Sequence, residues 1–263
     1  FPYTTLFRSF VSVPVVRAAA SLKIPCIIHE SDITPGLANK LCIPVAKKVC
    51  CNFPETLKKL PSGKAVLTGS PIRKELAEGN ALAGLEACGF TSAKPVILVM
   101  GGSLGSANVN QAVRSALPEL LKSFQIVHIC GEGKMDESYN SYKGYRQFEY
   151  VGAGLNDLMA MADIFISRAG ANVICEIQAL KKPALLIPLG TDASRGDQIL
   201  NARSFRSRGF AEVLMESDLN KETLLEMAED LYDNREKYTE AMNAADHGNA
   251  AETVADIIAS MVK

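Results

Sequence analysis

Three short stretches of the chain combine small residues with side chains that could bind a ligand. The first is Gly101-Gly102-Ser103-Leu104-Gly105-Ser106, which follows the apolar run Val96 to Met100 and precedes a helical pattern. Glycines let a backbone turn tightly and approach a ligand, while the unpaired N–H groups at a helix start attract phosphate. Ser103 adds a hydroxyl donor. This stretch predicts a phosphate-binding turn, with an ordinary strand-to-helix turn as the alternative.

The spacing of these glycines does not fit a nicotinamide dinucleotide site. The stretch lacks the G-x-G-x-x-G fingerprint, and no acidic residue stands about 20 positions further on at the end of a strand. A nicotinamide-dependent oxidoreductase is therefore disfavoured.

The second stretch runs from Ser167 through Arg168, Ala169 and Gly170 to Glu176. Its small residues follow an expected strand, and Glu176 stands one to two turns into the next helix. A carboxylate at this place can accept hydrogen bonds from both hydroxyls of a ribose. The alternative is an exposed helix glutamate that binds no ligand.

The third stretch is Pro188-Leu189-Gly190 followed by residues 195–202, where polar side chains gather near a helix start. Asp197, Gln198 and Asn201 could bind sugar hydroxyls, because carboxylate and amide groups supply both acceptors and donors. The alternative is that Asp197 only caps the helix.

Apolar or β-branched runs alternate with helical patterns from Phe10 onward, which is the order of an α/β protein with a parallel sheet. We expect strands at Cys26–His29, Lys48–Cys51, Ala65–Thr68, Val96–Met100, Ile126–Cys130, Phe148–Val151, Ile164–Ser167, Ala184–Pro188 and Ala211–Leu214. We expect helices at Val13–Ser21, Leu37–Leu41, Ser106–Ser123, Asn156–Met161, Ala171–Leu180, Asp197–Arg208, Lys221–Tyr232 and Ala250–Met261. Each of the three stretches follows an expected strand. Open α/β sheets bind ligands at the carboxyl ends of their strands, so the three stretches should line one cleft.

These elements fall into two α/β domains. Residues 10–70 supply about three strands, fewer than the typical sheet of about 5–6, whereas residues 95–245 supply a full set. Residues 71–94 are polar and rich in Gly and Ala, and we expect a linker there. Residues 246–263 should form a last helix that packs toward the first domain. Residues 1–9 resemble a translated sequencing adapter, with a genuine disordered terminus as the alternative, and we expect the natural protein to begin earlier.

Charge and composition exclude several functional classes. The formal net charge is −1 at pH 7 and the basic residues are scattered, so no nucleic-acid partner is expected. Seven cysteines without a C-x-x-C spacing suggest neither a disulfide framework nor a zinc site, and they favour a reducing cytoplasm. No apolar stretch approaches the ~20 residues that cross a bilayer. Any membrane contact is expected to be peripheral.

The ordered set of motifs resembles the MurG family of bacterial glycosyltransferases. Further matching segments extend the resemblance over Phe10 to Lys263, and they are Phe10–Pro14, Ile24-Pro25, His29-Glu30, Pro35–Lys40, Phe53–Thr56 and Gly69–Arg73. The resemblance implies two Rossmann-like domains of the GT-B type, the N-terminal one incomplete. It also implies inverting transfer of N-acetylglucosamine from UDP-N-acetylglucosamine to the 4-hydroxyl of undecaprenyl-pyrophosphoryl-muramyl-pentapeptide. This step converts lipid I to lipid II in peptidoglycan synthesis, at the cytoplasmic face of the bacterial membrane.

The same resemblance implies a donor site in the C-terminal domain. Its residues would be Arg73 near the diphosphate, Gly102 and Ser103 at the phosphates, Leu155 at the uracil edge, Glu176 at the ribose, and Asp197, Gln198 and Asn201 at the sugar hydroxyls. Backbone amides, a helix N-terminus and Arg73 can stabilise the leaving UDP. Because the chain has no Asp-x-Asp pair, we expect no metal and no cofactor.

On the acceptor side the resemblance implies His29, Glu30 and Asn39. The chain carries Ser31-Asp32 where many members carry Gln-Asn. The family's general base, a histidine in a first glycine-rich loop, is expected before Phe10, so no catalytic residue is assigned. We therefore expect this chain to bind the donor and to transfer poorly. A non-catalytic nucleotide-sugar-binding half, another GT-B transferase and an epimerase remain as alternatives.

Overall fold

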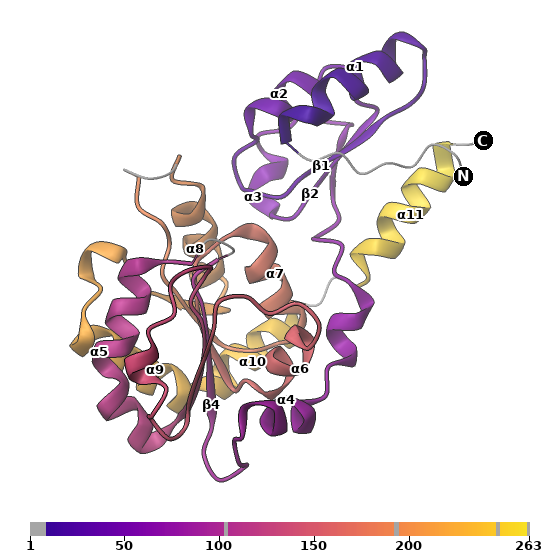
Figure 1. Cartoon of the computed structure of the whole chain (residues 1–263). Coiled ribbons are helices and arrows are strands. Elements are labelled where there is room, and N and C mark those ends of the chain that lie inside the picture. The colour runs from indigo at the N-terminus through magenta and orange to yellow at the C-terminus, as the bar shows by residue number, and fades with distance from the viewer. Residues whose placement is uncertain (1–8, 103–104, 192–194, 246–247, 262–263) are drawn as a thin grey trace. The chain divides into compact units, whose positions relative to one another are not determined.

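A computed structural model describes residues 9–102, 105–191, 195–245 and 248–261 of the chain. These residues form two compact units, each with its own parallel β-sheet. The smaller unit contains the described residues up to Pro71 and those from Gly248 onward. The larger unit contains the described residues from Ile72 to Ala245 (Figure 1).

The smaller unit is built on parallel strands in the order β1-β2-β3. Its elements are η1 (Ser9–Val11), α1 (Ser12–Ser21), β1 (Ile27–Glu30), α2 (Leu37–Cys42), β2 (Lys48–Cys51), α3 (Pro54–Leu57), β3 (Ala65–Leu67) and α11 (Ala250–Met261). Ile28 pairs with Val49 in register, and Cys51 pairs with Leu67. Apolar side chains from the sheet, from the helices and from the loops between them fill the core of this unit, among them Ile28, Cys42, Val49 and Leu60.

The larger unit is built on parallel strands in the order β6-β5-β4-β7-β8-β9. Its strands are β4 (Val96–Met100), β5 (Gln125–Ile129), β6 (Tyr145–Phe148), β7 (Ile164–Ser167), β8 (Ala184–Leu186) and β9 (Ala211–Val213). Its helices are η2 (Lys74–Glu78), α4 (Ala81–Cys88), α5 (Ala107–Ser123), η3 (Glu137–Tyr139), α6 (Leu155–Met161), α7 (Ala171–Ala179), α8 (Asp197–Ser207), η4 (Glu216–Asp218), α9 (Lys221–Asp233) and α10 (Arg235–Ala244).

The strand order reverses direction between β4 and β7. From β4 the chain proceeds outward to β5 and β6, returns through α6 to β7, and then proceeds the other way to β8 and β9. Such a reversal leaves a crevice at the carboxyl ends of the two central strands, which is where open α/β sheets bind ligands. The turns after β4 and β7 are therefore the parts of this unit best placed to hold one.

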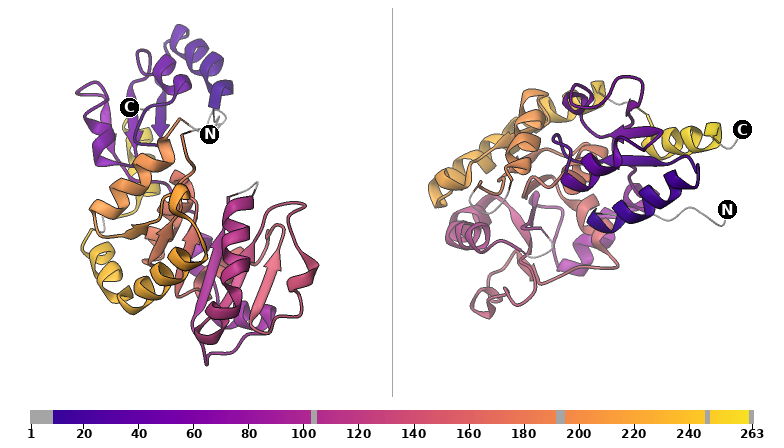
Figure 2. Two further views of the ribbon diagram at one scale, coloured as in Figure 1. Left: turned by 90° about the vertical axis from the view of Figure 1, so that its left-hand side faces the viewer. Right: turned by 90° about the horizontal axis from the view of Figure 1, so that it is seen from above.

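Helices cover both faces of this sheet, as burial of its central strands requires. Val96 to Val99 of β4 and all of β7 are buried. Figure 1 shows α5 and α9 beside each other on one side of β4 and α6 and α7 on the other. The strands and their helices can be followed from two further sides in Figure 2.

The segment 71–94, expected as a linker, is part of the packed larger unit. It contains η2 and α4, and α4 packs closely on α6. A Cβ added to Gly84 would lie 2.5 Å from the carbonyl oxygen of Asp157, so this glycine allows the two helices to approach closely. Asn80 caps α4 and the left-handed Gly89 ends it. Among the described helices, none is both long and apolar enough to span a membrane.

Candidate functional site

The turn between β4 and α5 is held in a shape that requires glycine. Gly102 and Gly105 have φ of +86° and +66°, and the Gly105 N–H donates to the Gly102 carbonyl over 2.9 Å. A Cβ at Gly105 would lie 1.9 Å from the carbonyl oxygen of Cys130. The backbone therefore forms the tight turn that the sequence predicted, while Ser103 lies outside the described residues.

Ser106 closes this turn and begins α5. Its hydroxyl accepts from the Val109 N–H at 3.4 Å, as an N-cap does. The start of this 17-residue helix therefore lies at the carboxyl end of β4. A helix start carries partial positive charge, which favours a phosphate there.

Arg168 joins the turns that follow the central strands, a role that the sequence analysis did not assign. Its guanidinium is buried and donates through Nη2 to Ser106 Oγ at 2.6 Å and through Nη1 to the Ile187 carbonyl at 3.1 Å. The Nη2 atom also pairs with Glu216 Oε1 at 2.6 Å. The hydrogen bond from Arg168 holds the pKa of Glu216 below its usual range.

Glu176 lies on α7 beside Arg73, so the structure brings two of the expected donor residues together. Arg73 Nη2 lies 3.7 Å from Glu176 Oε1. The Arg73 side chain is 65% exposed and the Glu176 side chain 24% exposed, so solvent weakens this pair. Burial raises the pKa of Glu176, and the positive charge of Arg73 opposes that rise.

The side chains of the third stretch hold loops together at the start of α8. Gln198 Oε1 accepts from the Leu189 N–H at 3.0 Å, just beyond β8. Asn201 is fully buried and donates to the Ala169 carbonyl at 3.3 Å, just beyond β7. Asn201 therefore fixes the loop after β7 and does not present its side chain at the surface.

Asp197 does not cap α8, so the alternative explanation considered for this residue is wrong. The N-cap position belongs to Gly196, a residue that has no side chain with which to cap the helix. Asp197 instead pairs with Arg195 at 2.7 Å.

Leu155 is the first residue of α6, after the left-handed Gly154. Its N–H donates to the Gly152 carbonyl at 3.3 Å within the preceding turn. Because α6 follows β6, Leu155 lies toward the same sheet edge as the other turns.

In the smaller unit, Glu30 and Asn39 shape the loop between β1 and α2. The buried Glu30 carboxylate accepts from the N–H groups of Asp32 and Gly36 at 3.0 and 2.9 Å and from Asn39 Nδ2 at 2.8 Å. Asn39 also donates to the carbonyl of His29 at 3.1 Å, and His29 Nε2 lies 3.0 Å from the Gly69 carbonyl. The three residues expected on the acceptor side are thus neighbours in one network.

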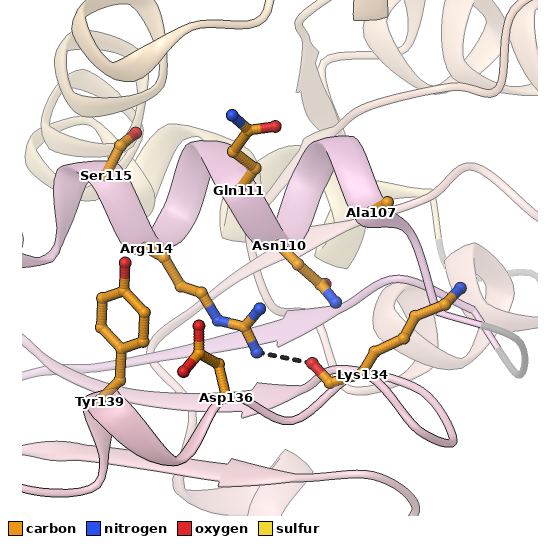
Figure 3. A pocket seen from close by; sticks show the side chains of 8 residues that line it. All are labelled: Ala107, Asn110, Gln111, Arg114, Ser115, Lys134, Asp136 and Tyr139. Carbon is orange, nitrogen blue, oxygen red and sulfur yellow. Dashed lines mark hydrogen bonds between the residues drawn. The ribbon is translucent and has the colours of Figure 1, made fainter.

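A groove of about 500 Å³ runs along α5 (Figure 3), and sequence reasoning did not predict it. The residues that line it are Ala107, Asn110, Gln111, Arg114, Ser115, Lys134, Asp136 and Tyr139. Arg114 and Asp136 point toward one another there, and Arg114 donates to the Lys134 carbonyl at 2.7 Å. Lys134 Nζ donates to the Gly105 carbonyl at 3.3 Å. This side of the groove therefore lies next to the turn between β4 and α5 that contains Gly102 and Gly105, called the glycine turn below.

The chain is similar to named bacterial transferases along most of its length. It is 60% identical to a protein of Lachnospira eligens and 59% identical to one of Lachnoclostridium phytofermentans, each over 249 residues. Both are named UDP-N-acetylglucosamine--N-acetylmuramyl-(pentapeptide) pyrophosphoryl-undecaprenol N-acetylglucosamine transferase. Each alignment covers 95% of this chain and 70% of the relative.

The fold is similar to that of a solved MurG structure from Acinetobacter baumannii. The TM-score is 0.75 at 27% identity, over 97% of this chain and 73% of that one. This likeness confirms the expected α/β fold with two Rossmann-like domains of the GT-B type.

Two family profiles match the chain. The glycosyltransferase family 28 C-terminal domain matches residues 96–261. The family 28 N-terminal domain matches residues 3–51, which include most of the first nine residues that resemble a translated adapter. The chain therefore belongs to glycosyltransferase family 28.

Proposed function

We propose that this chain transfers N-acetylglucosamine from UDP-N-acetylglucosamine to the 4-hydroxyl of undecaprenyl-pyrophosphoryl-muramyl-pentapeptide. The names of relatives at 59–60% identity support this substrate pair. The observation that carries the proposal is the edge at the strand-order reversal, where the glycine turn, the start of α5 and Glu176 follow the two central strands. Such an edge fits a nucleotide diphosphate.

In this proposal the larger unit holds the donor. The N–H groups of the turn at Gly102, together with the start of α5, bind the diphosphate, and Arg73 adds positive charge beside it. The Glu176 carboxylate accepts from the ribose hydroxyls, and the backbone around Leu155 meets the uracil edge.

The sugar lies against the start of α8. Asp197 and Gln198 stand on its first turn and supply carboxylate and amide groups for the hydroxyls. Asn201 acts indirectly, because its buried amide holds the loop after β7 in place.

The reaction is a single displacement at the anomeric carbon. The acceptor hydroxyl attacks from one face while UDP leaves from the other, which inverts the configuration. Negative charge grows on the leaving diphosphate, and donors already oriented toward it stabilise that charge without reorganising. We assign no residue of this chain as the base.

For the acceptor we propose that the β1–α2 loop of the smaller unit takes part through its backbone shape. Glu30 and Asn39 bind that loop and each other, so they set its shape and do not reach outward. The acceptor in the relatives' name carries an undecaprenol lipid. We therefore propose peripheral binding at the cytoplasmic face of the membrane.

The test is a calorimetric titration of the purified chain with UDP-N-acetylglucosamine, with UDP-glucose and NAD as competitors. Replacing Glu176 by Ala should weaken donor binding about tenfold or more, because a hydrogen bond to a charged group contributes about 1.5–3 kcal/mol. Glu229→Ala on the exposed face of α9 is the control and should bind normally. A folded chain that binds NAD instead, or that binds the donor equally well after Glu176→Ala, would refute the proposal.

A further inference from the structure

A line of buried hydrogen bonds runs from β6 through β5 to α5. The Tyr145 hydroxyl lies 2.9 Å from His128 Nδ1, and His128 Nε2 lies 2.9 Å from Asn110 Oδ1. Asn110 Nδ2 then donates to the Cys130 carbonyl at 2.9 Å. The side chains of Tyr145, His128 and Asn110 are all buried.

The donor and the acceptor in each bond of this line follow from its last acceptor, the Cys130 carbonyl. A carbonyl can only accept, so Asn110 must donate to Cys130 and must accept through its Oδ1. His128 therefore carries its proton on Nε2 and accepts from Tyr145 through Nδ1. Burial and the nearby Arg114 charge lower the pKa of His128 to about 3, so the ring is neutral, as this arrangement requires.

The line ends against the glycine turn. The carbonyl oxygen of Cys130 lies so close to Gly105 that an added Cβ would be 1.9 Å from it. Asn110 therefore donates to the same carbonyl oxygen that Gly105 packs against. Figure 3 shows Asn110 reaching from α5 toward the strands beneath the helix.

We infer that Asn110 is a positioning residue for the diphosphate-binding turn, and that His128 orients Asn110 for this task. The inference rests on the proposed function, in which the turn at Gly102 and Gly105 binds the diphosphate. Without Asn110 the Cys130 carbonyl loses this side-chain donor, although the Gly131 N–H of the same peptide unit still donates to the Glu149 carbonyl at 3.1 Å. The carbonyl that Gly105 packs against is then held less firmly.

The test uses the full chain and compares Asn110→Ala with Asn110→Ser, in case the first does not fold. The control is Gln111→Ala, the next residue of the same helix, whose side chain is exposed. Amide hydrogen exchange at Gly105, read by NMR, should accelerate about tenfold in the Asn110 variants, the loss expected for one buried hydrogen bond. Affinity for UDP should fall about tenfold, and Gln111→Ala should change neither quantity.

A second pair of variants separates positioning from general stability. Glutamine at position 128 can donate to Asn110 and accept from Tyr145, whereas leucine fills similar space without either bond. His128→Gln should therefore bind UDP nearly as well as the unmodified chain, and His128→Leu about tenfold more weakly. Equal UDP affinities for these two folded variants would overturn the role of His128.

The two proposals fail in different ways. Unchanged Gly105 exchange in the Asn110 variants would overturn the inference whatever the chain binds. Faster exchange with unaltered UDP affinity would overturn it as well. Failure of the unmodified folded chain to bind UDP would instead refute the proposed function.

Discussion

Arg168 Nη2 lies 2.6 Å from Ser106 Oγ, so the residue that follows β7 is bonded directly to the N-cap of α5. These two residues stand at the carboxyl ends of the two central strands, where the strand order reverses. Glu216 balances the buried charge of Arg168 from beyond β9. One guanidinium thus fixes the relative positions of loops that come from distant parts of the sequence.

Replacing Arg168 by Met should destabilise the larger unit by about 3 kcal/mol. Methionine keeps much of the length but leaves the Glu216 carboxylate without its buried partner, and breaking such a pair typically costs about 3–5 kcal/mol. Residual solvent contact of Glu216 favours the lower end of this range. Urea denaturation followed by circular dichroism measures the change.

The matched control is Arg206→Met, which removes an exposed arginine that lies 3.5 Å from Glu212. A surface pair of this kind contributes at most about 1 kcal/mol. A double-mutant cycle with Glu216→Gln should give a coupling of about 1–3 kcal/mol for the buried pair. Equal losses for the two arginine variants would contradict this account of Arg168.

Gly105→Ala should destabilise the larger unit by about 3 kcal/mol and abolish tight UDP binding. The new methyl group would meet the Cys130 carbonyl at 1.9 Å, and the left-handed backbone adds a cost of about 1–2 kcal/mol. Thermal unfolding and UDP titration measure the two effects.

Gly133→Ala is a close control, because Gly133 has φ of +67° but nothing within 4 Å of an added Cβ. It carries only the backbone cost, about 1–2 kcal/mol, and should leave UDP binding intact. If the two alanine variants behave alike, the contact between Gly105 and Cys130 is unimportant.

Three strands inside the sheets could be predicted from the sequence to the residue, whereas the bounds of the others differ by one or more residues. The expected bounds of β2, β4 and β7 agree with the structure, because these strands are mostly apolar and lie inside their sheets. β6 was expected at Phe148–Val151 but lies at Tyr145–Phe148. It is an edge strand, and its buried Gln147 is satisfied by side-chain bonds that an apolar pattern does not reveal.

Two α-helices of the larger unit, α4 and α10, were not predicted. The segment of α4 is rich in Ala and Gly and looked like a linker, although Asn80 and Gly89 are ordinary cap residues. α10 directly follows α9 through the single residue Asn234. Packing against other elements decides both helices, and local sequence contains little of that information.

For the site, local patterns predicted the turns but not the bonds between them. Glycine spacing was enough to predict the turn at Gly102, since left-handed backbone favours glycine. The role of Arg168 depends on Ser106, Ile187 and Glu216 meeting in space, and no spacing within the sequence encodes that meeting.

Glu30→Gln should destabilise the smaller unit by about 1–3 kcal/mol. The amide would face the N–H group of Asp32 or Gly36 with its own NH₂, leaving a buried donor without an acceptor. Hydrogen exchange of the Gly36 amide should rise in parallel. Glu86→Gln on the exposed side of α4 should change stability by less than about 0.5 kcal/mol. An unchanged Gly36 exchange rate would show that the carboxylate does not hold this loop.

His128 should make the larger unit lose stability as the pH falls below about 6.5, the ordinary histidine pKa. Burial lowers the folded-state pKa of His128 to about 3, so between these values only the unfolded chain binds the proton. Protonation then favours unfolding, with a slope of up to about 1.4 kcal/mol per pH unit from this one group. Above about 6.5 neither state is protonated at this ring and the effect disappears. Urea denaturation at several pH values should give a flatter dependence for His128→Gln than for the unmodified chain. Parallel curves would mean that the folded chain accepts a proton on His128 as readily as the unfolded chain does.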